Sequence, residues 1–237
     1  MIEFKNVDKA FGKLRVLNDV SAQLKKGECI AMIGPNGCGK TTLIKSILGM
    51  VIPTKGDILF DGKLINEEYA YRSRIGYMPQ IGRYPDNMNI GHVIEMMKEI
   101  RGTGTVLDEE LYKAFELSKL LNKKMHTLSG GTTQKVSATL AFMFNPEVLI
   151  LDEPTAGLDP IASEILKEKI IAEKSKGKLI LITSHLLSEL DDLVTQIIFM
   201  QEGKLLFQKP VIELLNETGE QKISKAIAHL LKQQKHV

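Results

Sequence analysis

The stretch GPNGCGKTT, residues 34–42, joins two runs of different character. The preceding ECIAMI, residues 28–33, is short and apolar, which is typical of a buried strand. The following TTLIKSILGM, residues 41–50, repeats its large apolar residues at helical spacing. A buried strand, a glycine-rich loop and a helix in this order predict an α/β domain with a phosphate-binding loop.

The loop has the spacing that phosphate binding requires. Glycines let backbone N–H groups approach phosphate oxygens, and the N-terminus of the following helix adds partial positive charge. Lys40 is predicted to reach the β- and γ-phosphates of a nucleotide, and the Thr41 hydroxyl to bind Mg²⁺. A glycine loop that arises by chance is the alternative. The predicted contacts in the loop are Gly34, Pro35, Asn36, Gly37, Cys38, Gly39, Lys40 and Thr41.

Strands and helices alternate along much of the rest of the chain. Apolar alternation or short apolar runs predict strands at residues 2–7, 16–24, 148–151, 178–183 and 197–200. Strands that alternate with helices predict a mainly parallel sheet covered on both faces.

Turn residues and helical patterns divide the chain further. Asp61-Gly62 and Glu202-Gly203 predict hairpin turns. Residues 90–144 have mostly helical patterns, for example in DEELYKAFELSKLL, residues 108–121. Apolar residues at helical spacing predict another helix after residue 221, either packed on the domain or serving a dimer or regulatory contact.

Two carboxylates follow the apolar run VLIL. Asp152 and Glu153 are expected at the C-terminal end of a buried strand, which is where α/β sheets bind ligands. Asp152 is predicted to hold Mg²⁺ through water, and Glu153 to act as the general base for an attacking water. Two solvated carboxylates at a strand end are the alternative.

A second glycine loop, LSGG, comes about a hundred residues after the first. Ser129, Gly130 and Gly131 precede a predicted helix, so this loop also presents a helix N-terminus to any anion. A simpler reading makes Ser129 the N-cap of that helix, and the two readings are compatible.

Composition narrows the class of protein. The chain has 237 residues and a net charge of +2, which argues against a general nucleic-acid binder, since that function needs a concentrated basic face. Its two cysteines, Cys29 and Cys38, favour a reducing compartment over a disulfide framework. The polar start of the chain and the absence of an apolar run of about 18 residues predict a cytosolic protein.

The motifs GPNGCGKTT, LSGG, LILDEP, GLDP and ITSH occur in that order. The chain therefore resembles the nucleotide-binding subunit of an ABC transporter over roughly residues 1–210. The resemblance implies a P-loop NTPase fold of ABC type, with a mainly parallel α/β core, an N-terminal antiparallel β-subdomain and an inserted α-helical subdomain at about 81–145. Residues 211–237 then form a C-terminal helical extension.

The resemblance also implies how the two glycine loops work together. In this family two subunits pair head to tail, and ATP on the phosphate loop of one is covered by the LSGG loop of the other. Further roles follow from the family motifs: Mg²⁺ and γ-phosphate sensing by Gln80, γ-phosphate contact by His185, a position across the dimer interface for Asp159, adenine stacking by Phe11 and α-phosphate contact by Thr42. Thr132 departs from the glutamine common after LSGG, whereas Gln134 and Lys135 match the pattern.

The resemblance implies ATP and Mg²⁺ as cofactors, a second ATPase subunit and separate transmembrane permease subunits as partners, and no nucleic acid. The second subunit is expected to be another copy or a related chain, and the protein to be peripheral on the inner face of the cell membrane. Residues 75–102 are similar to ATPase subunits linked to copper delivery and nitrous oxide reductase maturation. The alternatives are a soluble ABC ATPase that switches an assembly, and an ATP-binding module without catalysis.

Overall fold

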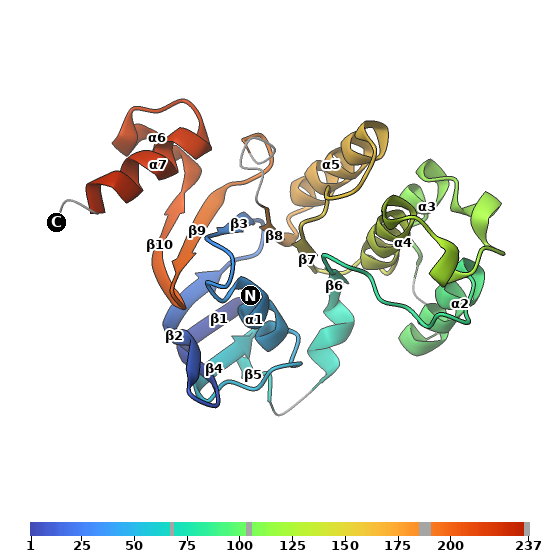
Figure 1. Cartoon of the computed structure of the whole chain (residues 1–237), viewed down its shortest axis with the longest axis horizontal. Coiled ribbons are helices and arrows are strands. Elements are labelled where there is room, and N and C mark those ends of the chain that lie inside the picture. The colour runs from blue at the N-terminus through green and yellow to red at the C-terminus, as the bar shows by residue number, and fades with distance from the viewer. Residues whose placement is uncertain (67–68, 103–105, 185–190, 235–237) are drawn as a thin grey trace. The chain divides into compact units, whose positions relative to one another are not determined.

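The computed structural model shows two compact units, which are described separately below (Figure 1). The first unit comprises residues 1–71 and 179–237, and the second unit comprises residues 72–178. The structure describes all residues except 67–68, 103–105, 185–190 and 235–237.

Four strands of the first unit form an antiparallel layer in the order β2-β1-β4-β5. They are β1 Ile2–Phe11, β2 Leu14–Leu24, β4 Lys55–Phe60 and β5 Lys63–Leu64. In β1 the side chains of Ile2, Phe4 and Val7 are buried, because one face of the layer packs on the core. The hairpin predicted at Asp61-Gly62 is confirmed by the antiparallel pairing of β4 with β5.

Four other strands of the first unit form a sheet with a parallel centre. They are β3 Cys29–Ile33, β8 Leu179–Thr183, β9 Gln196–Gln201 and β10 Lys204–Pro210. β3 lies between β8 and β9 and runs parallel to both, whereas β10 pairs antiparallel with β9 at the predicted Glu202-Gly203 turn. Every residue of β3 and β8 is buried, as expected for strands covered on both faces.

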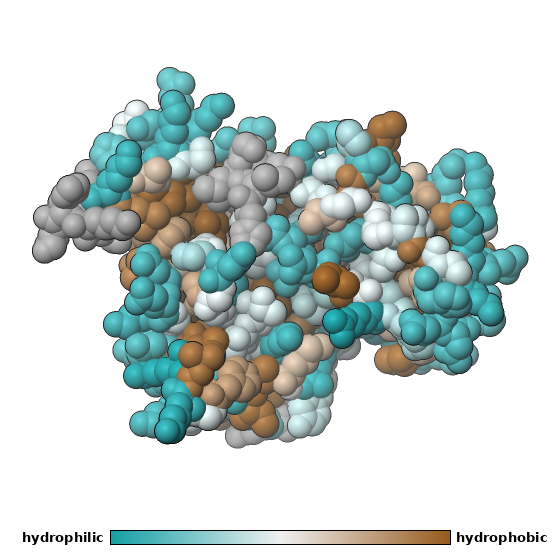
Figure 2. Space-filling view, in the orientation of Figure 1, coloured by the Kyte–Doolittle hydropathy of each residue, from teal (hydrophilic) through white to brown (hydrophobic). Residues whose placement is uncertain are grey.

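The described residues of the first unit form the α-helices α1 Lys40–Ile47, α6 Val211–Thr218 and α7 Ile223–Gln234. A cavity of about 560 Å³ lies between α7 and the β9–β10 hairpin, and its lining includes Pro35, Phe199 and Leu231. Figure 2 shows apolar side chains gathered on the surface in this region. The helical extension predicted for residues 211–237 contains α6 and α7, while its boundary as a separate domain stays a prediction.

The described residues of the second unit form a parallel pair of strands and several helices. The strands are β6 Ile75–Met78 and β7 Val148–Asp152, which are parallel to each other. The α-helices are α2 Ile90–Arg101, α3 Glu110–Ala114, α4 Gly130–Met143 and α5 Pro160–Ser175. The 3₁₀ helices are η2 Leu117–Leu120 and η3 Met125–Thr127, and η1 Ala70–Arg74 precedes β6.

The helical pattern over residues 108–121 is divided into two short helices in the structure. The chain forms α3, adopts a left-handed conformation at Glu116 with φ of 51°, and then continues as η2. Leu111 and Phe115 share one helical face, but Leu117, which is also buried, falls off that face in a continuous helix. The break lets all three apolar side chains reach the core.

Within the described parts of the chain, no helix is both long enough and apolar enough to cross a membrane.

Candidate functional site

The phosphate loop of the first unit is held tightly by its neighbours. It connects the end of β3 at Ile33 to α1, with Gly39 as N-cap at φ 109°. A Cβ atom on Gly34 would overlap the Met200 carbonyl oxygen and lie 2.7 Å from Cys38 Sγ. A Cβ atom on Gly39 would lie 2.8 Å from the Val16 carbonyl oxygen. Only glycine fits these two positions, because the backbone of β9 and β2 occupies the space.

Lys40 places its ammonium group at the mouth of this loop. The side chain is mostly buried, and Nζ donates hydrogen bonds to the carbonyl oxygens of Gly34 at 2.7 Å and Pro35 at 3.2 Å. The N-terminus of α1, which has eight residues, adds backbone N–H groups beside this cation. A narrow all-backbone cradle with one buried lysine fits a di- or triphosphate group.

Other residues predicted around this loop have suitable placement. Thr41 is exposed in the first turn of α1, where its hydroxyl would hold the Mg²⁺ that accompanies a nucleotide. Thr42 is partly exposed, as are Asn36 and Gly37 to a greater extent, whereas Cys38 is buried. The residues of the loop therefore fit ATP with Mg²⁺.

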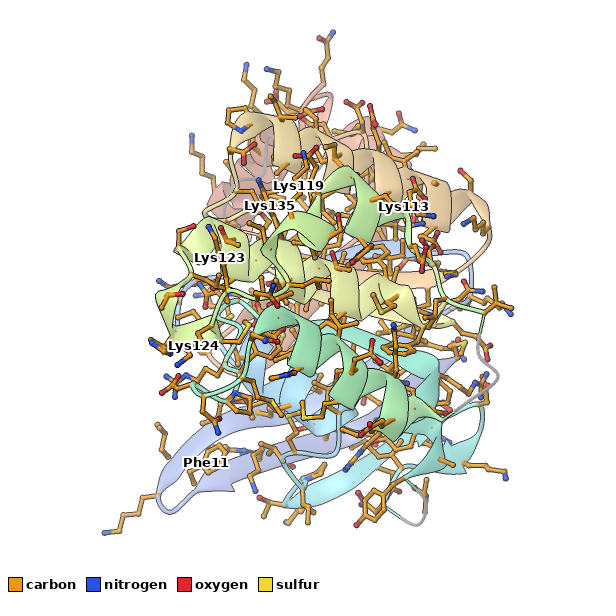
Figure 3. The ribbon with its side chains drawn as sticks, turned by 90° about the vertical axis from the view of Figure 1, so that its right-hand side faces the viewer. Phe11, Lys113, Lys119, Lys123, Lys124 and Lys135 are labelled. Carbon is orange, nitrogen blue, oxygen red and sulfur yellow. The ribbon has the colours of Figure 1, made fainter. Side chains whose placement is uncertain are left out.

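Phe11 offers a flat apolar surface at the end of β1. The Phe11 side chain is labelled in Figure 3 and is 51% exposed. Lys9 Nζ lies 4.9 Å from the centroid of its ring. An exposed aromatic ring is suited to stacking on a base, and the nearby cation adds favourable electrostatics to such a stack.

The two predicted carboxylates lie at the end of β7 in the second unit. Asp152 is the last residue of the strand and is buried, and Glu153 follows in a left-handed conformation with φ of 53°. The pKa of Tyr77 on β6 is raised to about 12. Burial is the larger cause, and the negative charge of Asp152 adds to it. A left-handed glutamate is strained and persists only where its surroundings hold it, which is common at functional sites.

The LSGG loop forms the start of α4. Ser129 is the N-cap of the helix, and its Oγ accepts a hydrogen bond from the Thr132 backbone N–H at 3.2 Å. The predicted capping role is therefore confirmed. Ser129 and Gly130 are exposed, whereas Gly131 is partly covered by the backbone of Gly157 in the GLDP segment.

The adjacent glycines Gly130 and Gly131 predict opposite responses to alanine. A Cβ atom on Gly131 would lie 2.7 Å from the Gly157 carbonyl oxygen, while one on Gly130 meets nothing within 4 Å. Gly131→Ala is expected to lower the free energy of unfolding by about 1–3 kcal/mol through overpacking. Gly130→Ala should leave it unchanged or raise it by up to about 1 kcal/mol.

Chemical denaturation of the nucleotide-free chain measures both variants of this glycine pair. Equal stability of the two variants would contradict the close approach between the LSGG and GLDP segments.

Asp159 of the GLDP segment caps α5. Its Oδ1 accepts a hydrogen bond from the Ala162 backbone N–H at 2.9 Å, and its Oδ2 accepts one from Lys135 Nζ at 2.6 Å. The hydrogen bond from Lys135 is the main reason why the pKa of Asp159 is lowered, and the Ala162 amide adds to the effect. Asp159 is thus held ionised beside the LSGG helix.

Gln80 lies two residues beyond β6. Its side chain is exposed, and its backbone carbonyl oxygen accepts a hydrogen bond from Gln134 Nε2 at 2.7 Å. His185 lies outside the described residues. The sequence identified Gln134 and Lys135 only as matches to a family pattern, whereas the structure shows that each joins α4 to another predicted site segment.

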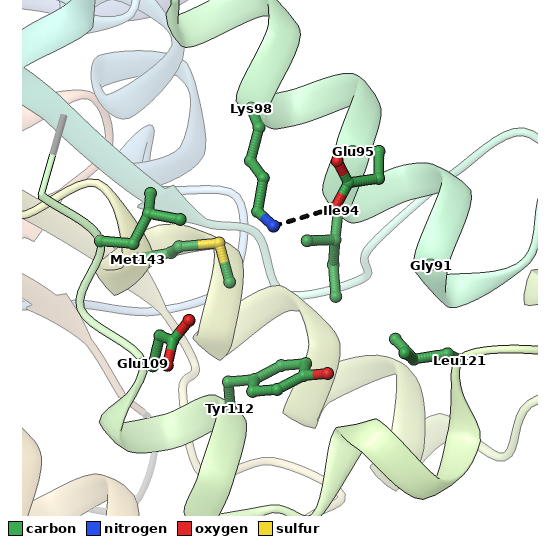
Figure 4. A pocket seen from close by; sticks show the side chains of 9 residues that line it. Gly91, Ile94, Glu95, Lys98, Glu109, Tyr112, Leu121 and Met143 are labelled. Carbon is green, nitrogen blue, oxygen red and sulfur yellow. Dashed lines mark hydrogen bonds and ion pairs between the residues drawn. The ribbon is translucent and has the colours of Figure 1, made fainter. Parts of the chain in front are cut away.

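Each unit therefore gathers its own group of predicted site residues. The first unit holds the phosphate loop and Phe11. The second unit holds Asp152, Glu153 and the segments around Gln80, Ser129 and Asp159. A separate cavity of about 230 Å³ in the second unit is lined by side chains of α2, α3 and nearby segments, and none of the predicted site residues lines it (Figure 4).

Known proteins match this chain closely. A sequence model of the family described as ABC transporter matches residues 17–156. The chain is 35% identical over 208 residues to the Nod factor export ATP-binding protein I of Burkholderia lata, covering 86% of this chain and 68% of that protein. It is 34% identical over 211 residues to the lantibiotic transport ATP-binding protein SrtF of Streptococcus pyogenes, covering 88% and 90% respectively.

Solved structures match the whole fold. A structure of the ATP-binding subunit of an ABC transporter has a TM-score of 0.90 at 26% identity and covers 98% of this chain and 99% of that one. The dimeric post-hydrolysis structure of the ATP-binding cassette MJ0796 with ADP and Pi has a TM-score of 0.79 at 25% identity, covering 89% and 99%. Together with the phosphate loop and the LSGG and LILDEP segments, these matches show that the chain belongs to the ABC transporter family as an ATP-binding ATPase subunit with the P-loop fold of ABC type.

Proposed function

We propose that this chain is an ATP-driven motor subunit that closes as a dimer around two ATP molecules and drives a separate membrane permease. One observation carries the proposal. The chain has a built phosphate cradle in its first unit and a second exposed helix N-terminus, at Ser129 and Gly130, in its second unit. Two copies arranged head to tail supply both anion-binding elements to each nucleotide.

The residues then take complementary roles. Lys40 and the N-terminus of α1 neutralise the phosphate charge, and Phe11 stacks on the adenine. Thr41, Asp152 and Gln80 would hold Mg²⁺, Asp152 through water, and the ion would neutralise charge that develops on the phosphates. Glu153 accepts a proton from the attacking water. His185 contacts the γ-phosphate, while Ser129, Gly130, Gly131 and Asp159 reach the ATP of the partner copy.

The relatives support transport as the coupled process. Their names assign them to Nod factor export and lantibiotic transport, in which they are the ATP-binding proteins. We infer that this chain docks on permease subunits at the inner face of the cell membrane. The cargo is left open, and the link of residues 75–102 to copper and nitrous oxide reductase stays a prediction.

A pull-down from a detergent extract tests the partner. Membrane subunits that co-purify with the chain support transport. Ribosomes or DNA-binding proteins in their place would support the alternative of a soluble switch.

Lys40→Ala tests the nucleotide site. Because a hydrogen bond to a charged group contributes roughly 1.5–3 kcal/mol, losing the ammonium is expected to weaken ATP binding by about 10- to 100-fold. Lys45→Ala is the matched control, since Lys45 is exposed in the last turn of the same helix and should leave the affinity unchanged. Isothermal titration with a non-hydrolysable ATP analogue measures both, and undiminished affinity in Lys40→Ala would remove the phosphate loop from its assigned role.

A further inference from the structure

The first two turns of α4 contact the segment that follows β6. Gln134 is buried, and its Nε2 donates to the Gln80 carbonyl oxygen at 2.7 Å. One turn later, Ser137 Oγ and Tyr84 Oη lie 2.9 Å apart. A Cβ atom on Gly82 would overlap Ser137 Oγ, so the backbone of this segment lies directly on the helix. The segment containing Gln80 is therefore attached to α4 by side-chain hydrogen bonds and by close backbone packing.

Lys135, which follows Gln134 in α4, contacts the GLDP segment. Lys135 Nζ donates to Asp159 Oδ2 at 2.6 Å and lies 5.9 Å from the centroid of the Phe115 ring. Figure 3 shows Lys135 projecting from α4. The aromatic ring restricts the long side chain, so that its charge stays beside Asp159. Consecutive helical residues point about 100° apart, which lets Gln134 and Lys135 reach different segments from one helix.

Core packing alone does not explain Gln134. Among the described residues, its Oε1 is buried and has no hydrogen-bond partner. A buried acceptor without a partner costs free energy that leucine or methionine at the same position would avoid. The hydrogen bond from Gln134 Nε2 to the Gln80 carbonyl oxygen is the contact that leucine or methionine could not make.

We infer that Gln134 and Lys135 are positioning residues that hold the Gln80 segment and the GLDP segment against the helix that begins with the LSGG loop. The inference rests on the proposed function, in which these three segments act on nucleotide together. Neither side chain is assigned a contact with ATP. Each acts through another group, Gln134 through the backbone of Gln80 and Lys135 through the carboxylate of Asp159.

Hydrogen exchange on the nucleotide-free chain tests the contacts themselves. Gln134→Met should raise amide exchange in residues 79–84 by about tenfold, and Lys135→Met should do so in residues 155–162. Lys135→Arg should retain the protection. Lys119→Met is the matched control, because Lys119 forms an exposed ion pair with Glu116 and should change neither region.

Steady-state kinetics then separates positioning from folding. Gln134→Met and Lys135→Met are expected to lower kcat by about tenfold with KM for ATP unchanged, because the phosphate loop stays intact. Lys135→Arg should restore most of kcat. Lys135→Met combined with Asp159→Asn should cost no more than the larger single effect, since asparagine retains the cap of α5 but not the charge.

The outcomes distinguish this inference from the proposed function. Unchanged exchange in both methionine variants overturns the inference, and so does raised exchange with an unchanged kcat. If the wild-type chain shows no ATP hydrolysis with or without a permease, the proposed function fails, and the exchange results alone decide whether α4 holds the two segments.

Discussion

Glu153→Gln is expected to lower ATP hydrolysis by about a hundredfold to ten-thousandfold, which is the contribution of a general base. The glutamine side chain has nearly the same shape, but its amide cannot accept the proton of the attacking water. ATP binding should persist, because the phosphate loop belongs to other residues in the first unit. The variant should therefore accumulate as a closed, ATP-bound dimer.

Phosphate release and size-exclusion chromatography with light scattering measure the two effects of Glu153→Gln. The control is Glu116→Gln, because Glu116 has almost the same left-handed backbone, with φ of 51° against 53°, but pairs with Lys119 on the surface. A change in backbone strain would affect both variants alike. Normal hydrolysis by Glu153→Gln would remove Glu153 from its role as base.

Lys169→Met is expected to lower the free energy of unfolding by about 3–5 kcal/mol, the usual cost of breaking a buried ion pair. The Lys169 side chain is only 1% exposed, and its Nζ lies 2.5 Å from Asp108, 2.6 Å from Glu110 and 3.0 Å from Glu173. Glu173 is equally buried and also pairs with Lys176 and Lys178. Removing the Lys169 ammonium takes one of three cationic partners from the buried Glu173 carboxylate and leaves Asp108 and Glu110 without their ion pair to this lysine.

Urea denaturation measures this loss, with Lys167→Met as the control on the same helix. Lys167 pairs with the exposed Glu164, and surface pairs contribute only about 0–1 kcal/mol. Equal stability of Lys167→Met and Lys169→Met would show that the buried cluster contributes little.

The same cluster determines the acid stability of the second unit. Burial by itself would raise the pKa of Glu173, but hydrogen bonds from Lys176, Lys178 and Lys169 outweigh it and lower the pKa to about 2. The folded pKa is below the unfolded value of about 4.3, so this contribution is present above that pH. It is lost as the pH falls toward 2, and Glu173→Gln should flatten that part of the stability profile.

Much of the fold was predictable because local patterns determine local structure. The buried strand before Gly34, the helix after it and the turns at Asp61-Gly62 and Glu202-Gly203 follow from apolar spacing and turn residues. The helical pattern of residues 108–121 did not indicate the break at Glu116, which allows Leu117 to be buried. The sequence pattern of one segment does not show where the core lies against which that segment packs.

The candidate site, like the fold, was predictable from the sequence only in part. The order of the glycine loops and carboxylates along the chain was sufficient to assign a nucleotide-binding chemistry, since each motif carries its own chemical groups. The roles of Gln134 and Lys135 were not accessible, because their partners Gln80 and Asp159 are distant in sequence and are brought to α4 only by folding.

The sequence by itself determined which residues we propose to hold phosphate and which helices present them, because backbone conformation and helix N-termini depend on neighbours along the chain. Only the tertiary structure decided why Gly34 and Gly39 must be glycine, why Glu153 is strained and which side chains join the site segments. Those features depend on contacts between residues far apart in sequence, and such contacts exist only once the core has packed.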